Sequence, residues 1–266
     1  MRYTGRPMIR RAAFAAGMAA FSVYAQAPAG RAGTPQPPPN AKQSAPFDIT
    51  GYWMSLITED WRYRMLTPPK GDFAGVPLNR EALKIANSWD PASDDAAGQQ
   101  CRGYGAPIIM RLPGRLHIFW QDDQTLKVEA DAGTQSRLFY FGTPRSQGGD
   151  WQGVSQASWE FMPTPIAATD GGRTGLGRVD KQAGSLKVVT TKFRPGYLRK
   201  NGVPYSADAV VTEYYDRVSE PNGDSHLVIT TRVEDPTYLT QPFLMSSHFE
   251  KQVDASGWNP TPCLVK

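Results

Sequence analysis

Most hydrophobic segments of this chain repeat with a period of two residues rather than 3.6. In residues 126–131, apolar side chains at the even positions alternate with charged side chains at the odd positions. Successive side chains of a β-strand point to opposite faces, so this pattern predicts a strand with one buried and one wet face. About ten such segments follow one another, mostly separated by Gly, Pro, Asp or Asn residues that favour tight turns. The expected strands span 49–57, 61–65, 116–121, 126–131, 137–141, 154–161, 186–191, 210–218, 227–233 and 245–251.

Helical signals are confined to the connection from Thr67 to Pro107. Asn79 is a suitable N-cap for a short helix that runs to about Trp89. Asp90 can cap a second helix, because Pro91 then occupies its first turn, where a missing N–H costs nothing. The connection is therefore expected to contain one or two short helices.

The predicted fold class is all-β, an antiparallel meander of short strands. Such a meander closes into a barrel or folds into a sandwich, and we favour a lipocalin-like barrel because closure removes exposed edge strands. The residues from Phe47 onward suffice for one β-rich domain, which is assigned to 47–266. Residues 164–184 are Gly-rich without a pattern and are expected to form a long mobile loop.

The N-terminus has the features of a secretory signal. Residues 1–27 contain a basic start, an uncharged apolar stretch at 12–23 that is too short to span a bilayer as a helix, and Ala25-Gln26-Ala27 as a cleavage pattern. Cleavage near Ala27 would leave a periplasmic or secreted protein without an integral membrane segment, and the export route stays open between the general and the twin-arginine pathways. The basic start consists of Arg2, Arg6, Arg10 and Arg11.

Removing this signal also changes the charge of the chain. The whole chain carries a net charge of +4, and the four arginines of residues 1–27 account for all of it. A nucleic-acid partner is therefore not expected for the near-neutral mature protein. The Pro-rich residues 28–46 cannot form a regular helix or ladder and are expected to be a flexible tether.

The chain contains two cysteines, Cys101 and Cys263. An even number of cysteines in an exported protein favours a disulfide, and two cysteines allow only one pairing. Two buried thiols are the alternative. The bridge would tie the C-terminal end of the chain to the early part of the domain.

Gly51-Tyr52-Trp53 at the start of the first expected strand resembles the G-x-W opening of lipocalins. In that family the tryptophan closes one end of the barrel. The resemblance implies a lipocalin-like β-barrel.

The stretch from Trp151 to Pro242 resembles a group of exported bacterial proteins of unknown function, and it covers about a third of the chain. The resemblance implies an exported, lipocalin-like β protein and supplies no reaction. Val154 stands where members of the group often carry histidine, so a role resting on that histidine does not transfer. The shared phrases are Trp151-x-Gly153-x-Ser155, Trp159-Glu160, Gly202-x-Pro204-x-Ser206, Thr212-Glu213 and Asp235-Pro236-x-Tyr238-x-x-x-Pro242.

Two strand carboxylates are the candidates for catalysis. Glu160 and Glu213 would have a raised pKa if they faced an apolar barrel interior, and could then act as general acid or base. The alternative is structural, with Glu213 paired to Arg217 or Arg194 across strands. No cofactor or metal site is expected, because the three histidines lack ligand spacing and the glycines match no nucleotide-binding loop.

Aromatic and basic side chains on the expected strands are the candidates for binding. Aromatic faces combined with arginine suit a small amphipathic or aromatic molecule whose acidic group pairs with a guanidinium. The long connection 194–205 carries both kinds of residue and is expected to form the rim of the site. The candidate binding residues are Arg62, Arg64, Trp120, Arg137, Trp159, Tyr197, Tyr214 and His248.

The leading functional hypothesis is an exported protein that holds a small amphipathic molecule in its barrel. The second is a cofactor-free isomerase, lyase or hydrolase that acts on such a molecule through Glu160 or Glu213. The third is a structural or assembly module of the envelope, reached through the Pro-rich tether. The sequence leaves the oligomeric state open.

Overall fold

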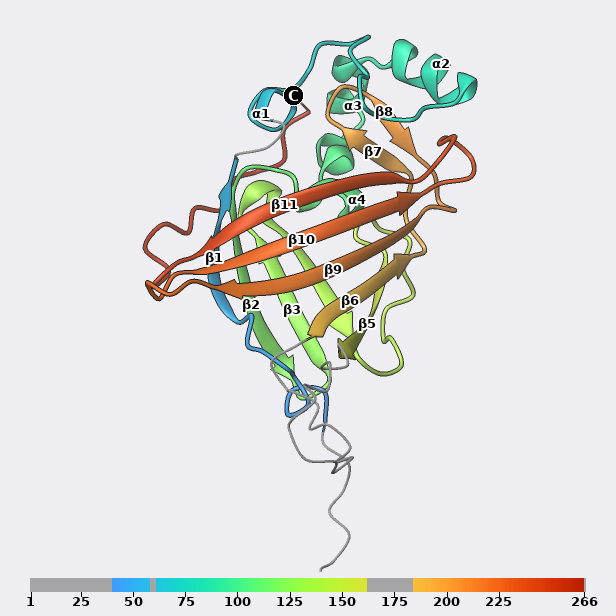
Figure 1. Cartoon of the computed structure of the whole chain (residues 1–266). Coiled ribbons are helices and arrows are strands. Elements are labelled where there is room, and N and C mark those ends of the chain that lie inside the picture. Colours follow the sequence, from blue (N-terminus) through green and yellow to red (C-terminus); the bar gives the residue numbers. More distant parts are fainter. Residues whose placement is uncertain (1–39, 58–60, 162–183, 266) are drawn as a thin grey trace, which may run out of the picture. The chain divides into compact units, whose positions relative to one another are not determined.

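The computed structural model describes residues 40–57, 61–161 and 184–265. Residues 1–39, which include the expected signal and most of the tether, lie outside the described residues, as do residues 164–183 of the expected mobile loop. The described body is built around a closed barrel of nine strands (Figure 1). These strands are β1 (Gly51–Leu56), β2 (Arg115–Asp122), β3 (Thr125–Ala130), β4 (Gln135–Tyr140), β5 (Val154–Phe161), β6 (Gly184–Thr191), β9 (Val210–Ser219), β10 (Ser225–Glu234) and β11 (Phe243–Lys251).

The barrel is a meander with two irregular steps. β1 pairs with both β2 and β11 and so closes the ring. β6 pairs with β9 because the hairpin of β7 (Gly196–Arg199) and β8 (Val203–Tyr205) leaves the barrel between them. β4 and β5 run parallel and share only the pairs Phe139–Ser155 and Tyr140–Gln156, since residues 141–153 return the chain before β5 begins.

The structure confirms the expected all-β barrel and nine of the ten expected strands. The strand expected at 61–65 is wrong, because this segment forms the single-turn helix α1 (Trp61–Arg64). A strand needs a neighbour for its backbone groups, and β1 already pairs directly with β2, which leaves no place in the ring for another strand. Trp61 and Met65 are exposed and Arg64 is buried, the reverse of the expected orientation.

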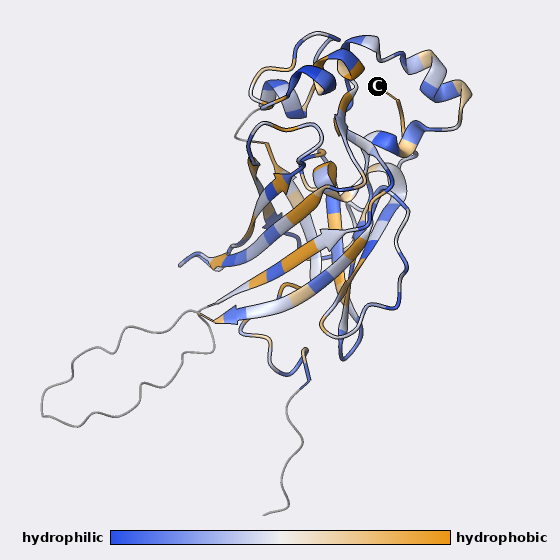
Figure 2. Ribbon diagram, turned by 90° about the vertical axis from the view of Figure 1, so that its right-hand side faces the viewer, coloured by the Kyte–Doolittle hydropathy of each residue, from blue (hydrophilic) through white to orange (hydrophobic). Residues whose placement is uncertain are grey.

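The alternation that predicted the strands places apolar side chains inside the barrel. Figure 2 shows hydrophobic and hydrophilic residues alternating along the barrel strands. The interior core includes Ile118, Leu126, Phe139 and Ile229, all fully buried. Trp53 is also fully buried, and its Nε1 donates to the Ile49 carbonyl at 2.9 Å.

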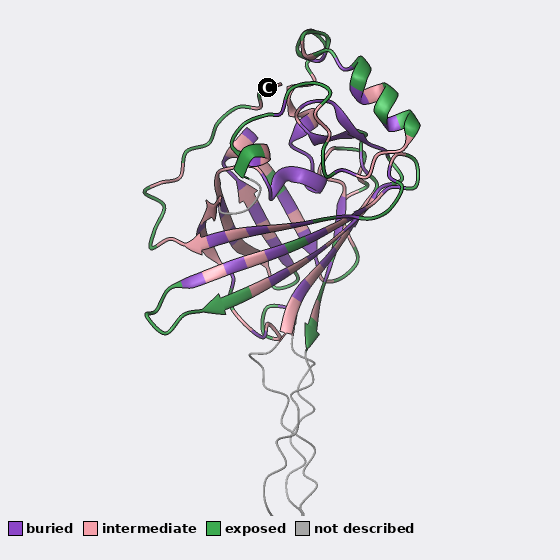
Figure 3. Ribbon diagram, turned by 45° about the horizontal axis from the view of Figure 1, so that its top comes forward, coloured by how far each residue is buried: buried purple, intermediate pink, exposed green. Residues whose placement is uncertain are grey.

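A cap of short elements covers one end of the barrel (Figure 1). Two of its helices confirm the expected caps: the Asn79 side chain accepts from the Ala82 N–H at 2.9 Å, and the Asp90 side chain accepts from the Ala92 N–H at 3.0 Å. The β7–β8 hairpin is buried beneath the largely exposed helix α2 (Figure 3). The cap consists of α1, α2 (Arg80–Ser88), α3 (Pro91–Ala96), the 3-10 turn η1 (Gln100–Gly103), α4 (Ala106–Ile109) and the hairpin.

The chain before β1 lies against the barrel at the β2–β3 turn. Residues 40–46, which composition assigns to the tether, are not free of the domain: the Lys42 N–H donates to the Asp123 carbonyl at 3.2 Å. The Trp159 indole N–H donates to the Ala41 carbonyl at 2.8 Å. The folded body therefore begins a few residues earlier than the expected boundary at Phe47.

The expected disulfide is confirmed. Cys101, in η1, is bonded to Cys263, with 5.0 Å between the two Cα atoms. The bridge holds the C-terminal segment against the capped end of the barrel, where the Thr261 N–H donates to the Asp131 carbonyl at 2.9 Å. Over the described residues, no helix combines the length and apolar character required to traverse a bilayer.

Candidate functional site

Glu213 lies inside the barrel and is fully buried, as is its partner Arg137 on β4. The two side chains form a two-pronged ion pair, with Nη1 to Oε1 at 2.9 Å and Nη2 to Oε2 at 2.6 Å. Arg137 Nη2 also donates to Thr190 Oγ1 at 3.1 Å and lies 3.4 Å from Ser155 Oγ. The partner of Glu213 is thus an interior arginine and not Arg217 or Arg194.

The electrostatics of this cluster favour the charged form of Arg137 and the neutral form of Tyr215. Burial disfavours the charged guanidinium, but the adjacent Glu213 carboxylate outweighs burial and raises the pKa of Arg137. Burial and the same carboxylate raise the pKa of Tyr215, whose hydroxyl lies 3.3 Å from Glu213 Oε1. Both oxygens of Glu213 therefore accept hydrogen bonds inside a packed core, which suits a structural ion pair better than a general base.

Glu160 occupies the opposite face of the barrel wall. Its side chain is 47 % exposed and pairs with Lys187 Nζ at 2.7 Å. The hydrogen bond that Lys187 donates to Glu160 also raises the pKa of Lys187. The two carboxylates proposed for catalysis therefore do not meet in one site.

Four of the five recurring phrases noted in the sequence supply residues to two buried hydrogen-bond networks. Ser155 and Glu213 both reach Arg137 in the first network. In the second, the Asp235 carboxylate accepts from the Ser206 N–H at 2.6 Å and from Ser206 Oγ at 2.8 Å. Buried polar groups need such partners, so these residues have a scaffold role in the fold.

Trp120 and Trp159 lie together near the end of the barrel opposite the cap. Their ring centroids are 6.5 Å apart, and Phe141 lies 5.5 Å from Trp120 and 5.2 Å from Trp159. Phe47, from the segment before β1, packs edge-on against Trp159 at 5.6 Å. These two candidate binding residues therefore belong to one partly buried aromatic cluster.

The remaining strand candidates are dispersed. Tyr197 is buried within the cap, where its hydroxyl donates to Asp94 Oδ2 at 2.7 Å. Tyr214 lies on the outer wall under Lys187, and His248 lies on the outer face of β11 beside Ser246 at 3.2 Å. Arg62 is exposed and pairs with Asp72 at 3.3 Å.

Arg64 lines a cavity at the capped end of the barrel. Its Nε donates to the Arg111 carbonyl at 3.0 Å and its Nη1 to the Leu56 carbonyl at 3.1 Å, which fixes the guanidinium at the capped end of the barrel. Two adjoining cavities open there, of about 470 Å³ and about 40 Å³, and we call them together the cap pocket. The larger cavity falls in the size range of small-molecule sites, whereas the smaller one has room for a few water molecules. Both cavities are lined by Arg64, Leu66, Thr67, Leu112 and Lys200.

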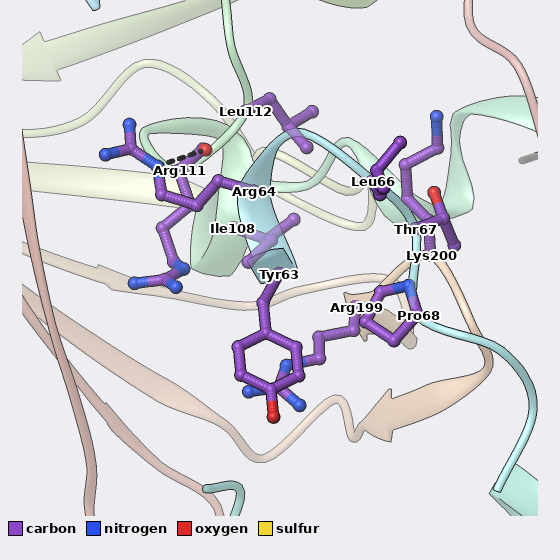
Figure 4. Close-up of a pocket in the computed structure, with 10 residues that line it drawn as sticks. All are labelled: Tyr63, Arg64, Leu66, Thr67, Pro68, Ile108, Arg111, Leu112, Arg199 and Lys200. Atoms are coloured by element: carbon purple, nitrogen blue, oxygen red, sulfur yellow. Dashed lines mark hydrogen bonds between the residues drawn. The ribbon is translucent and has the colours of Figure 1, made fainter. Parts of the chain in front are cut away.

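Figure 4 shows the side chains that line the smaller cavity of the cap pocket, where arginine and lysine side chains lie beside apolar ones. In the smaller cavity the Arg199 guanidinium lies over the Tyr63 ring, 4.6 Å from its centroid. The larger cavity combines the apolar side chains of Met65, Leu66 and Leu112 with the cations of Arg64 and Lys200. Arg64, Arg111 and Arg199 are buried and also take part in further interactions. No acidic side chain occurs among the described residues that line either cavity. This arrangement can accept an apolar body together with a negatively charged group.

Sequence reasoning missed Tyr104 and the leucines of the pocket. Lys200 lies in the connection 194–205 that was expected to form a rim, although this connection forms the β7–β8 hairpin rather than a loop. Tyr104 stands between two glycines, three residues after Cys101, and this local signal could have indicated a tightly packed position.

Comparison with family models, with curated proteins and with solved structures finds no match for this chain.

Proposed function

We propose that this chain is an exported β-barrel protein that binds a small amphipathic anion in the cap pocket. The observation that carries the proposal is the placement of Arg64 and Lys200 beside the apolar side chains of Leu66 and Leu112 in one cavity of about 470 Å³. Apolar contacts supply most of the affinity for such a ligand, and the cations select its charge.

The barrel interior supports binding less well than the cap pocket. Arg137, the interior arginine considered for ligand recognition, is occupied by Glu213. Large side chains such as Trp53, Phe139 and Phe249 are buried in the interior with almost no exposed surface. The proposed site therefore lies at the end of the barrel rather than along its axis.

Export is supported by the N-terminal pattern and by the disulfide, which is typical of oxidising compartments. The test is the mass of the mature protein recovered from a periplasmic fraction of a bacterial host. Cleavage near Ala27 with no free thiol is the expected result. A full-length, reduced protein in the cytoplasm would contradict export.

Binding is tested by thermal unfolding with matched probes below their micelle concentrations. Dodecanoate is expected to raise the Tm, whereas dodecanol has a weaker effect and dodecylammonium none, because the pocket presents cations. At a hundred times the dissociation constant, a ligand that binds only the folded state contributes about 2.7 kcal/mol of stability.

A pair of lysine variants serves as the matched control. Lys200 and Lys187 each lie over a tyrosine ring, at 4.8 Å and 5.6 Å, but only Lys200 lines the cap pocket. Lys200→Gln is expected to lose most of the response to dodecanoate, while Lys187→Gln keeps it. Equal stabilisation by all three probes, or equal responses of the two variants, would rule out this site.

A further inference from the structure

We propose that the Tyr104 hydroxyl is the hydrogen-bond donor that recognises the ligand in the cap pocket, and that the ligand's head group is an oxyanion such as a carboxylate. This inference rests on the proposed function and adds the chemical class of the head group. Tyr104 lies between η1 and α4, lines the larger cavity together with Lys200, and is 6 % exposed.

The hydrogen bonds around Tyr104 determine whether its hydroxyl can act toward a ligand as a donor or as an acceptor. Lys200 Nζ donates to Tyr104 Oη at 3.0 Å, and the Leu264 N–H donates to the same oxygen at 3.1 Å. An ammonium group and a backbone N–H are donors only, so Tyr104 Oη is the acceptor in both bonds. Its own proton remains to be donated, and within the described part of the chain no acceptor for it is found.

Tyr104 and Lys200 together form a donor pair beside the cavity. The hydroxyl and the ammonium group are 3.0 Å apart, so one oxyanion can accept from both. An alcohol head group can accept from the hydroxyl but gains little from the positive charge. A cationic head group is repelled by Lys200 and offers no acceptor, so the pair selects an oxyanion.

Two glycines make room for this pair. A Cβ atom on Gly133, whose φ is +71°, would lie 2.4 Å from Cδ1 of the Tyr104 ring. A Cβ atom on Gly103 would lie 2.9 Å from Cγ of Lys200. Tyr104 and Lys200 therefore pack directly against backbone positions where a larger residue would collide with them. Their contact belongs to the packed structure of the cap.

The test is the affinity of the oxidised, full-length mature protein for four probes that share one chain, measured by isothermal titration calorimetry. The probes are decanoate, decanesulfonate, decylphosphonate and decanol. Tyr104→Phe removes only the hydroxyl and is expected to weaken the binding of the anions about ten-fold, because hydrogen bonds to charged groups are the strong ones. Decanol is expected to change much less, and the order among the three anions identifies the preferred head group.

Two further variants separate ligand recognition from a structural effect. Leu264→Pro removes the backbone donor to Tyr104 but keeps the hydroxyl, and it is expected to retain at least most of the affinity for decanoate. Tyr205→Phe removes a buried hydroxyl outside the pocket and is expected to leave every affinity unchanged. If Tyr104→Phe does not fold, Lys200→Gln carries the test, with a loss expected for the anions and not for decanol.

The outcomes distinguish the two proposals. If the wild-type protein binds the anions and Tyr104→Phe binds them equally well, the role of Tyr104 is overturned while the proposed function stands. Equal losses in Tyr104→Phe and Leu264→Pro would also overturn it, because they would trace the effect to the anchoring of the C-terminal segment. If the wild-type protein binds none of the anions, the proposed function is overturned and this inference with it.

Discussion

Removal of the Glu213 carboxylate should destabilise the barrel far more than removal of the Glu160 carboxylate. Glu213→Gln leaves the Arg137 guanidinium in the interior with only neutral hydrogen-bond partners, Ser155 and Thr190 among them. Breaking a buried ion pair in this way costs about 3–5 kcal/mol. Glu160→Gln breaks an exposed pair on the outer wall and should cost less than about 1 kcal/mol.

The assay is equilibrium unfolding in urea, followed by tryptophan fluorescence, for the two single variants. The free energy of unfolding of a domain of this kind is about 5–15 kcal/mol. The loss in Glu213→Gln is a large fraction of this value, so the urea concentration at the midpoint of unfolding should fall markedly. A double variant, Arg137→Met with Glu213→Leu, removes both charges together. It should recover most of the stability, because a well-packed apolar pair can replace a buried ion pair.

Two results would refute this reasoning. Similar small losses for Glu213→Gln and Glu160→Gln would show that the interior pair is solvated and contributes little. A double variant that is less stable than Glu213→Gln would show that the ion pair stabilises the barrel more than a packed apolar pair does. In either case the description of the cluster as a compensated buried pair would be wrong.

Three further predictions concern the stability of the fold. Cys263→Ser opens a bridge across a sequence separation of 162 residues and should cost up to about 4–5 kcal/mol, measured by urea unfolding against the oxidised wild type. Burial raises the pKa of Tyr205 and Tyr215 above the ordinary value of 10.0, so each phenol leaves stability unaffected below pH 10. Above pH 10, stability should fall by about 1.4 kcal/mol per pH unit for each phenol, because only the unfolded state ionises, and an unchanged midpoint up to pH 11 would contradict this. Gly133→Ala should lower the Tm more than Gly98→Ala, because both glycines have positive φ but only a Cβ on Gly133 meets a buried ring; equal shifts would argue against the close contact.

The barrel was predictable because its signal is local. In β3 each apolar residue faces the interior and each charged residue faces out, so the alternation alone gives the orientation of the strand. The segment 61–65 has the same alternation and yet is helical, because pairing partners are a property of the whole ring and not of five residues.

The candidate site was less predictable, because its residues are brought together by the cap. Arg64, Tyr104 and Lys200 come from α1, the end of η1 and the β7–β8 turn, and no periodic pattern links them. The sequence identified Arg64 as a binding candidate because it is an arginine among aromatic residues, but it assigned Arg64 to a strand rather than to helix α1. Glu213 and Arg137 were identified as residues of the barrel, but their pairing depends on β4 and β9 facing each other across the interior.

The number of strands in the ring has a topological consequence. In a closed barrel whose adjacent strands are all antiparallel, strand direction alternates around the ring. Such alternation requires an even number of strands. A ring of nine cannot satisfy this, so one adjacent pair must run in the same direction, and β4 with β5 is that pair. The mismatch is concentrated where the ladder is shortest, whereas β9 and β10 pair along their whole length. The parallel seam is thus the place where the barrel has the fewest backbone bonds to lose, and the place where adding or removing one strand would restore strict alternation.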